Sequence, residues 1–297
     1  MLVSSITEKI HMIDSPFHGK TGLLSTYIVD SDEKVIIDPG PTSQIQGVYE
    51  GLNKLDIKEL GWILLTHIHL DHGAGSWKLL EAFPEADLYC HPRGESHMID
   101  PSKIVRAAKE AFGEQFSMYG EVRGLKEEKV ISSSDGEVIE LGDVNLQVIW
   151  TPGHSTHSQS YFEPNEKVIF VGDSAGHMPY DDIVIPASPP PFNPEDTVES
   201  IKKLIGLKPE VICYSHFGFK KAAVEKLEKF KDQVELWKNI VTGCVGKAMS
   251  LSETFSFLAE RDPRVKELLE LDPEGKSHVY HSLNGFYSYA QWKMRKK

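Results

Sequence analysis

Cysteine is scarce in this sequence, and the few cysteines present are not arranged as pairs. Cys90, Cys213 and Cys244 lie far apart and form no CxxC motif. Secreted proteins stabilised by disulfides, and zinc sites built from thiolates, need paired or closely spaced cysteines. We therefore expect three free thiols in a reducing compartment, by default the cytoplasm, with Cys90 and Cys213 as small residues of the hydrophobic core.

Long hydrophobic segments and an excess of basic residues are also missing. No stretch approaches the ~20 apolar residues of a membrane-spanning helix, and the N-terminal segment MLVSSITEKIHMID has no apolar core typical of a signal peptide. The 32 lysines and arginines are outnumbered by 44 acidic residues, which gives a formal net charge of −12. This charge argues against a nucleic-acid partner, which normally requires a basic face, although bound divalent cations would weaken the argument. We expect neither a membrane nor a nucleic acid as partner.

Histidine, by contrast, is concentrated in one short segment, THIHLDHG at residues 66–73. It follows the apolar segment WILL at residues 62–65, which is typical of a buried strand. Imidazole nitrogens together with a carboxylate suit zinc, and also iron or manganese. Neighbouring side chains leave an extended backbone in opposite directions, so these four candidate ligands cannot all reach one ion. The simplest arrangement sends His67 and His69 to one ion, and Asp71 and His72 to a second.

The second half of the sequence places a potential metal ligand after each of three apolar, strand-like segments. Residues 144–150 lead to TPGHS with His154, residues 167–171 lead to Asp173, and residues 210–214 lead to SHFG with His216. A glycine lies within two residues of each ligand, and glycine allows close backbone approach where loops leave a sheet. Together with the 66–73 segment, these positions predict one metal centre assembled at strand ends.

Three other polar residues near strand ends are ambiguous or ordinary. Asp38, after the strand expected at residues 34–37, is either a turn residue or an aspartate that orients a metal-bound histidine. His91 and His97 have no ligand spacing between them, so we interpret both as loop histidines.

The rest of the sequence predicts helices around and after these strands. Residues 44–55, 75–83 and 101–126 have helical patterns, and Asn193 caps a helix that runs to about Gly206. Beyond residue 219 the composition shifts to charged amphipathic helices, expected at residues 220–241, 252–258, 262–271 and 277–295. We therefore predict a catalytic domain over residues 1–219 and a helical C-terminal extension over residues 220–297.

The assembled motifs resemble those of the metallo-β-lactamase superfamily. The match consists of HxHxDH at residues 67–72 and then His154, Asp173 and His216 in the family's order, with IDPG at residues 37–40 and the TPGHS segment. It covers residues 1 to about 219 and implies an α/β fold, an αββα sandwich with the metals at one edge between two sheets. The resemblance also implies the ligand sets: His67, His69 and His154 for one ion, Asp71, His72 and His216 for the other, and Asp173 as a bridge.

The resemblance further implies the chemistry. Two divalent ions, zinc in the first place and iron or manganese otherwise, would share a hydroxide that attacks a small ester, thioester or related substrate. Asp71 would also pass a proton as a catalytic residue. The helical extension makes the chain similar to glyoxalase II, with a small molecule as its partner. The long C-terminal helices would also allow two copies to pair as a homo-oligomer.

Departures from the individual branches leave the substrate open. Quorum lactonases carry a tyrosine where this chain has Gly176, and glyoxalase II carries a phenylalanine at the position of His177. Persulfide dioxygenases, which use a single iron, have an arginine after the aspartate, whereas this chain has no lysine or arginine between Asp173 and Lys202. That activity and an RNase or phosphodiesterase activity are the alternatives, and the acidic charge counts against the second.

Residues that act on the substrate are less clear from the sequence than the metal ligands. His177 and Tyr180 are the catalytic candidates outside the ligand set. The pocket is expected between the loop at residues 186–194, the 101–126 region and the C-terminal helices. Its candidate lining residues are Phe17, Tyr180, Phe192 and Tyr287.

Overall fold

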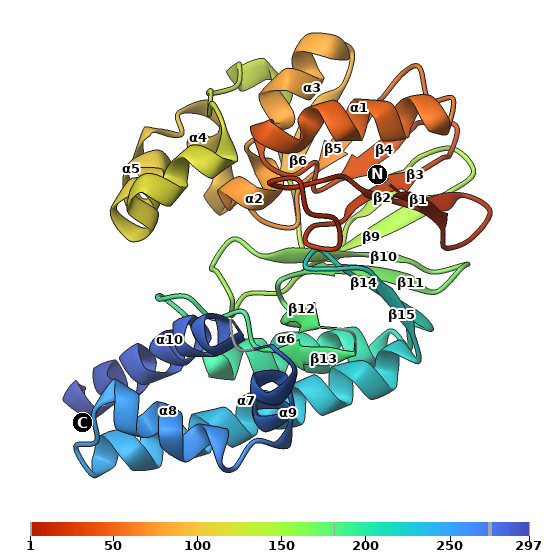
Figure 1. Cartoon of the computed structure of the whole chain (residues 1–297). Helices are drawn as coiled ribbons and strands as arrows, with labels where there is room; N and C mark the ends of the chain where they lie inside the picture. Colours follow the sequence, from red (N-terminus) through yellow and green to blue (C-terminus); the bar gives the residue numbers. More distant parts are fainter. Residues whose placement is uncertain (1, 181, 273–274, 297) are drawn as a thin grey trace.

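Two β-sheets pack face to face in the computed structural model, which describes residues 2–180, 182–272 and 275–296 (Figure 1). The first sheet has the strand order β1-β2-β3-β4-β5-β6-β7 and the second the order β15-β14-β11-β10-β9-β8. Helices cover the outer face of each sheet, so the layers run helix, sheet, sheet, helix. The predicted αββα sandwich with C-terminal helices is confirmed.

The first sheet is formed by the N-terminal half of the chain. Its strands β1 to β3 are antiparallel neighbours, whereas β4, β5, β6 and β7 run parallel. The strands are β1 (Leu2–Ser5), β2 (Ile10–Asp14), β3 (Thr26–Val29), β4 (Val35–Ile37), β5 (Trp62–Leu64), β6 (Asp87–Cys90) and β7 (Val130–Ser132). Its helices are η1 (Thr42–Gln44), α1 (Ile45–Lys54), α2 (Leu70–Gly73), α3 (Ser76–Ala82), α4 (Pro92–Ile99), α5 (Ser102–Phe112), η2 (Gly113–Tyr119) and η3 (Glu127–Lys129).

The second sheet is mostly antiparallel, but β11 and β14 run parallel. Its strands are β8 (Val138–Glu140), β9 (Asn145–Trp150), β10 (Gln159–Glu163), β11 (Val168–Gly172), β14 (Val211–Tyr214) and β15 (Phe219–Lys221). A separate hairpin consists of β12 (His177–Tyr180) and β13 (Ile183–Ile185). The C-terminal half supplies the helices α6 (Pro194–Gly206), α7 (Ala223–Gly246), α8 (Leu251–Ala259), α9 (Pro263–Leu271) and α10 (Gly275–Arg295).

The cores follow from the alternation of side chains along each strand. Phe170 of β11 faces the first sheet and packs in the cluster that contains Tyr27 and Leu64. Its neighbour Ile169 faces the opposite way, into a cluster shared with the C-terminal helices, which contains Trp237 of α7 and Phe286 of α10. The C-terminal helices therefore share one core with α6 and the second sheet. Among the helices of the described residues, none is both long and apolar enough to cross a membrane.

Two helical expectations differ from the structure. The helix predicted over residues 101–126 ends at Phe112, because Gly113 adopts φ +55 and the chain continues as the tighter turn η2. His97 was expected in a loop but lies in the last turn of α4, and His91 is the N-cap of that helix. The loop interpretation of His97 was wrong. The helix α4 is short, and its adjacent apolar residues Met98 and Ile99 do not show a helical repeat in the sequence.

Candidate metal centre

The candidate ligands lie in segments that follow the ends of strands, and these strands belong to both sheets. His67 follows β5 in the first sheet, and Asp173 and His216 follow the parallel strands β11 and β14 in the second. Gly172 lets these ends approach closely: it adopts φ +53, and a Cβ at this position would lie 2.3 Å from Thr66 Oγ1. The fold therefore brings ligands from both halves of the chain to one edge of the sandwich.

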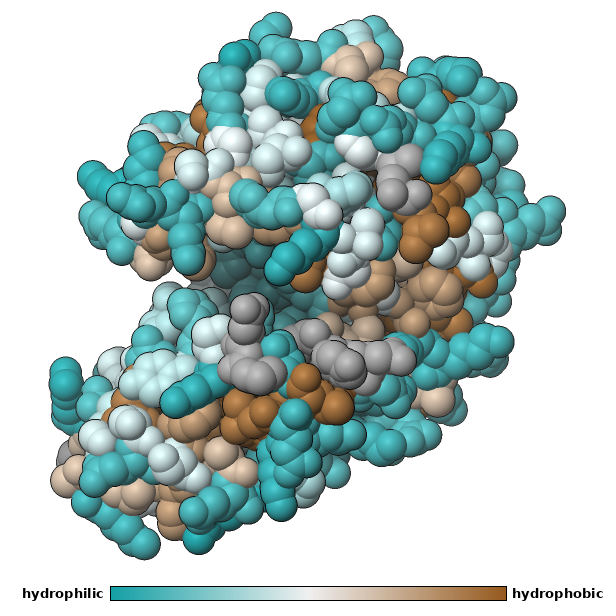
Figure 2. Space-filling model, in the orientation of Figure 1, coloured by the Kyte–Doolittle hydropathy of each residue, from teal (hydrophilic) through white to brown (hydrophobic). Residues whose placement is uncertain are grey.

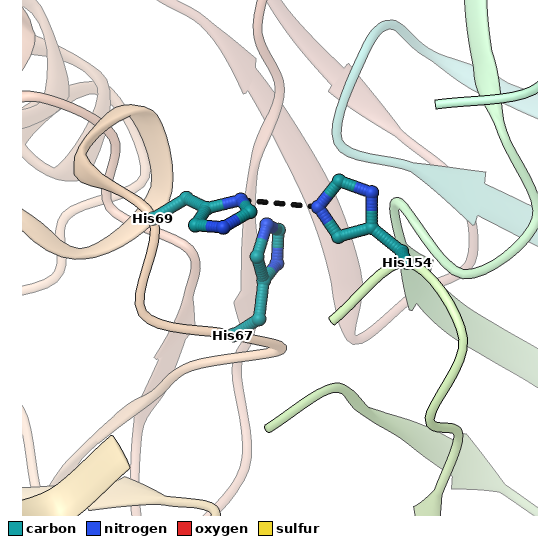
Figure 3. Close-up of side chains that lie close together, drawn as sticks. All are labelled: His67, His69 and His154. Atoms are coloured by element: carbon teal, nitrogen blue, oxygen red, sulfur yellow. Dashed lines mark hydrogen bonds between the residues drawn. The ribbon is translucent and has the colours of Figure 1, made fainter. Parts of the chain in front are cut away.

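Three histidines form a first ligand group (Figure 3). His67 and His69 come from the loop after β5, and His154 reaches them from the loop after β9. The ring centroid of His67 lies 4.6 Å from that of His69 and 4.8 Å from that of His154. His69 Nδ1 and His154 Nε2 are 3.0 Å apart, and His154 Nδ1 donates to the Ala187 carbonyl at 2.7 Å. The Ala187 contact fixes the ring of His154 with Nε2 turned toward the other two histidines.

Asp71, His72 and His216 form a second ligand group beside the first. Asp71 Oδ2 lies 3.3 Å from His216 Nε2 and 3.9 Å from His72 Nε2. The side chain of His72 is 1% exposed, whereas those of Asp71 and His216 are both 26% exposed. Within this second group, Asp71 and His216 are therefore the members open to a small molecule.

Asp173 lies between the two groups. Its Oδ2 is 3.7 Å from His154 Nε2, and its Oδ1 is 3.5 Å from His72 Nε2 and 3.6 Å from His216 Nε2. One carboxylate thus faces the first group with one oxygen and the second with the other. This is the arrangement that a bridging ligand requires.

Asp38 holds the second group in place from behind. Its Oδ2 accepts hydrogen bonds from His72 Nδ1 at 3.0 Å, from Thr66 Oγ1 at 2.6 Å and from Ser215 Oγ at 2.8 Å. Its other oxygen accepts from the Thr66 amide at 2.8 Å. Because Nδ1 of His72 is occupied, Nε2 is the nitrogen left for a metal. Of the two interpretations of Asp38, the structure shows the orienting one, and its φ of +48 also makes it a turn residue.

The first group is electrically neutral. Burial, followed by the neighbouring histidines, lowers the pKa of His67 and of His69 well below the usual value. Burial also lowers the pKa of His154, although Asp173 acts in the opposite direction. Unprotonated imidazoles at pH 7 have the free lone pairs that a cation needs.

The second group carries opposite charges at close range. Burial would raise the pKa of Asp71, but His72 and His216 outweigh it and lower the pKa of this carboxyl, so Asp71 is ionised. Burial would lower the pKa of His72, but Asp71, Asp173 and Asp38 raise it to about 10. Asp173 and Asp71 likewise raise the pKa of His216 against the effect of burial. The carboxylates of this site stabilise protons on His72 and His216. A bound metal cation would displace these protons and would be stabilised by the same carboxylates.

The residues fit divalent metal ions. Among the described residues, His67 Nε2, His72 Nε2 and Asp173 Oδ1 are buried without a hydrogen-bond partner. Leaving a buried polar atom unsatisfied costs about 1–3 kcal/mol, and three such atoms lie at one place. A cation between them would satisfy all three. The donor set of imidazole nitrogens and carboxylate oxygens suits zinc, iron or manganese.

The two catalytic candidates outside the ligand set lie on the hairpin β12–β13. The ring centroid of His177 is 6.2 Å from that of His216, so this residue borders the second group. Tyr180 ends β12, but its side chain lies outside the part that the structure describes. His177 remains a candidate for contact with substrate.

Two of the aromatic residues expected to line a pocket are instead structural. Phe192 is buried, and its ring centroid lies 4.6 Å from that of Phe286 in the core shared with α10. Tyr287 donates its hydroxyl to the Met249 carbonyl at 2.8 Å, which ties α10 to the chain before α8. These expectations were wrong, because a sequence does not show which face of a C-terminal helix is covered.

Two residues near the ligands were not singled out by the sequence, although Tyr119 lies in the 101–126 region expected to border the pocket. His157 lies three residues after His154, and its ring centroid is 5.5 Å from that of His69; burial, followed by His154, lowers its pKa to about 3. Tyr119 packs with Leu70 and Ala74, which flank Asp71 and His72 in the sequence. The motif spacing gave a signal for His157, but Tyr119 comes from a distant turn, η2, with no motif of its own.

Comparison with known proteins gives one family. Residues 20–216 match the family model described as the metallo-beta-lactamase superfamily. The chain is 30% identical over 230 residues to the "Metallo-beta-lactamase fold-containing protein ST1585" of Sulfurisphaera tokodaii, a match that covers 75% of this chain and 84% of that protein. It is 28% identical over 147 residues to a hydroxyacylglutathione hydrolase of Francisella tularensis subsp. novicida, which covers 50% of this chain and 45% of that protein.

Solved structures have the same fold. The crystal structure of ST1585 superposes with a TM-score of 0.67 at 26% identity, covering 76% of this chain and 86% of that one. The metallo-beta-lactamase family protein TTHA1429 of Thermus thermophilus superposes with a TM-score of 0.72 over 97% of this chain and 95% of that one. At 17% identity, the second match shows likeness of fold alone.

Proposed function

Since this chain belongs to the metallo-β-lactamase superfamily, we propose that it is a metal-dependent hydrolase with two divalent ions, most simply zinc, that cleaves a small ester or thioester. The position of Asp173 carries this proposal. Its two carboxylate oxygens lie within 3.5–3.7 Å of ligand nitrogens from the two separate groups. A site for one ion needs no such bridge, so the arrangement supports two ions. The single-iron dioxygenases share this ligand motif, and the absence of a lysine or arginine between Asp173 and Lys202 argues against them.

When bound, the two ions would supply Lewis acidity and a hydroxide nucleophile at neutral pH. The protein's own residues set the geometry for that chemistry. Asp38 orients His72, and the Ala187 carbonyl orients His154, each through the ring nitrogen that faces away from the centre. Asp71, which is ionised and 26% exposed, is placed to accept a proton from the attacking group and to return it to the leaving group.

Thioesters are the substrate class favoured by the relatives. A hydroxyacylglutathione hydrolase matches half of this chain, and the C-terminal helices pack against the same core as the ligand-bearing second sheet. We place the activity in the cytoplasm, because all three cysteines, each within the described ranges, are buried and free.

The test is hydrolysis by the zinc-loaded protein of a panel of thioesters, esters, lactones and phosphodiesters, compared with two variants. The His69→Ala variant removes a ligand of the first group and is expected to lower kcat at least ~1000-fold while leaving the circular dichroism spectrum unchanged. His97→Ala, a histidine of α4 outside the centre, serves as the matched control and is expected to keep full activity. If His69→Ala, fully depleted of metal, hydrolysed substrate at the wild-type rate, hydrolysis would not depend on this metal centre and the proposed function would be wrong.

A further inference from the structure

Aromatic and imidazole side chains from β12, α10, α5 and η2 extend in a chain of neighbours away from the second ligand group and back toward it. From His216 these neighbours continue to His177 at 6.2 Å between ring centroids, and from His177 to His278 of α10 at 5.6 Å. One turn further along α10, on the same face, His281 lies against Phe112 of α5, with centroids 6.5 Å apart and ring planes 25° apart. The C-terminal helix thereby reaches the N-terminal half of the chain beside the metal centre.

The other side chains of this set lead back toward Asp71. The ring centroid of Phe112 lies 5.7 Å from that of Tyr119, and Tyr119 packs on Leu70 and Ala74. Asp71 follows Leu70 in the chain, and its Oδ2 lies 3.3 Å from His216 Nε2. We call the following five residues together the collar: Phe112, Tyr119, His177, His278 and His281.

Helices α5 and α10, which carry Phe112, His278 and His281, lie on the two sides of a hollow of the surface (Figure 1). Figure 2 shows a cleft between the N-terminal part of the molecule and the C-terminal helices, with hydrophilic residues at its depth. Phe112 is 36% exposed, and His278 and His281 are exposed on α10, so the rim of the collar is open to solvent. A substrate that approached Asp71 and His216 through this cleft would pass the collar.

The two walls of the collar differ in chemistry. Phe112 and Tyr119 form an apolar wall, which Phe116 extends at 6.2 Å from Tyr119. The opposite wall carries three imidazoles, and within the described part of the chain His177 Nε2 is buried without a hydrogen-bond partner. On the apolar wall, Lys109 Nζ lies 5.1 Å from the centroid of Phe116 and adds a positive charge there. In a protein of net charge −12, a rim with imidazoles and a lysine favours an anion.

We propose that the collar is the substrate-binding site and that it selects acyl compounds with a carboxylate beyond the scissile bond. The imidazole wall binds the carboxylate through ring N–H groups, and the apolar wall packs against the rest of the substrate. This inference rests on the proposed hydrolase and names its substrate class. It also assigns the C-terminal helix α10 a part in specificity.

The first test compares thioesters that differ in one carboxylate. On the thiol side, the pair is the benzoyl thioester of mercaptoacetate and that of mercaptoacetamide; on the acyl side, it is the ethyl thioester of succinic acid and that of succinamic acid. The zinc-loaded wild type is expected to prefer the charged member of at least one pair about tenfold in kcat/KM, through KM. The double variant His278→Asn/His281→Asn is expected to lose this preference through a higher KM for the charged thioester.

A second readout requires no turnover. In the zinc-loaded protein, the ring signals of His278 and His281 in nuclear magnetic resonance spectra are expected to shift saturably with phenylacetate and not with phenylacetamide. His97→Asn, the matched control, is expected to keep both the shifts and the preference. Hydrolysis without any carboxylate preference and without these shifts would overturn the collar proposal alone. Saturable shifts without hydrolysis of any thioester would support the collar and overturn the proposed function.

Discussion

His72 Nδ1 donates a hydrogen bond to Asp38 Oδ2 at 3.0 Å, and both side chains are almost completely buried. The same oxygen accepts from Thr66, which follows β5 of the first sheet, and from Ser215, which follows β14 of the second. Asp38 therefore connects the two sheets and one metal ligand in a single hydrogen-bond network. Networks of this kind orient a ligand and raise its basicity, and their loss costs metal affinity.

Asp38→Asn is expected to lower the affinity for the second metal ion about 10–100-fold, because an amide is a weaker acceptor for His72 and carries no charge. The measurement is competition for zinc against a chelator of known affinity. Asp262→Asn is a matched control, since Asp262 is equally buried and accepts from Trp237 and Gln233 far from the centre. Equal zinc affinity in the Asp38→Asn variant and the wild type would show that Asp38 has no role in holding the ligand.

Gly285→Ala is expected to destabilise the protein by about 1–3 kcal/mol and to weaken zinc binding. A Cβ at Gly285 in α10 would lie 1.8 Å from the Ser188 carbonyl oxygen, so α10 and this loop must move apart. The neighbouring Ala187 carbonyl holds His154, so the shift reaches the first ligand group. The measurements are urea unfolding and zinc competition.

Gly243→Ala provides the control for that substitution. Gly243 also lies within a helix, α7, but a Cβ there meets nothing within 4 Å. Replacing a helical glycine by alanine in open space stabilises by up to about 1 kcal/mol. Opposite signs are therefore expected for the two substitutions. A stabilising effect of Gly285→Ala would show that α10 does not pack on this loop as described.

His91→Asn is expected to flatten the pH dependence of stability between about pH 6.5 and 4. Burial, and then Arg93, lower the pKa of His91 to about 4, and its Nδ1 accepts from the Arg93 amide as the N-cap of α4. In the unfolded chain His91 binds a proton near pH 6.5, whereas in the folded chain it stays unprotonated down to about pH 4. The free energy of unfolding therefore falls as the pH falls through this window. Asparagine keeps the cap without titrating.

The measurement for His91 is the free energy of unfolding of metal-free wild type and variant at pH 7, 5 and 4. The variant is expected to gain up to about 3 kcal/mol relative to the wild type across that range, because one unit of pKa difference corresponds to about 1.4 kcal/mol. A difference between the two proteins that stays constant with pH would mean that His91 is not protonated differently on folding.

Much of the candidate centre was predictable because its candidate ligands lie in local sequence patterns. The 66–73 segment, and single ligands after apolar strands, are visible in the sequence, and the structure brings all seven predicted ligands together. The start of α6 was equally visible, since Asn193 caps it by accepting from the Glu195 and Asp196 amides. In each case, the residues that reveal the feature lie within a few residues of one another in the sequence.

The surroundings of the centre were not predictable, since they depend on which elements meet in space. Tyr119 and His281 lie far apart in the sequence and are linked only through Phe112. Phe192, expected at a pocket, is buried against Phe286 because α10 covers it. A pattern within one helix shows that a face is apolar, but not which element packs against it.

Metal content is the decisive measurement for the proposed two-metal centre. The protein would be purified without chelator or added metal, and zinc, iron and manganese per chain measured by inductively coupled plasma mass spectrometry. We expect about two ions per chain, mainly zinc or manganese, since Asp173 faces both ligand groups. About one iron per chain, with little else and no uptake of a second ion, would contradict the two-metal hydrolase and indicate oxygen chemistry at a single metal.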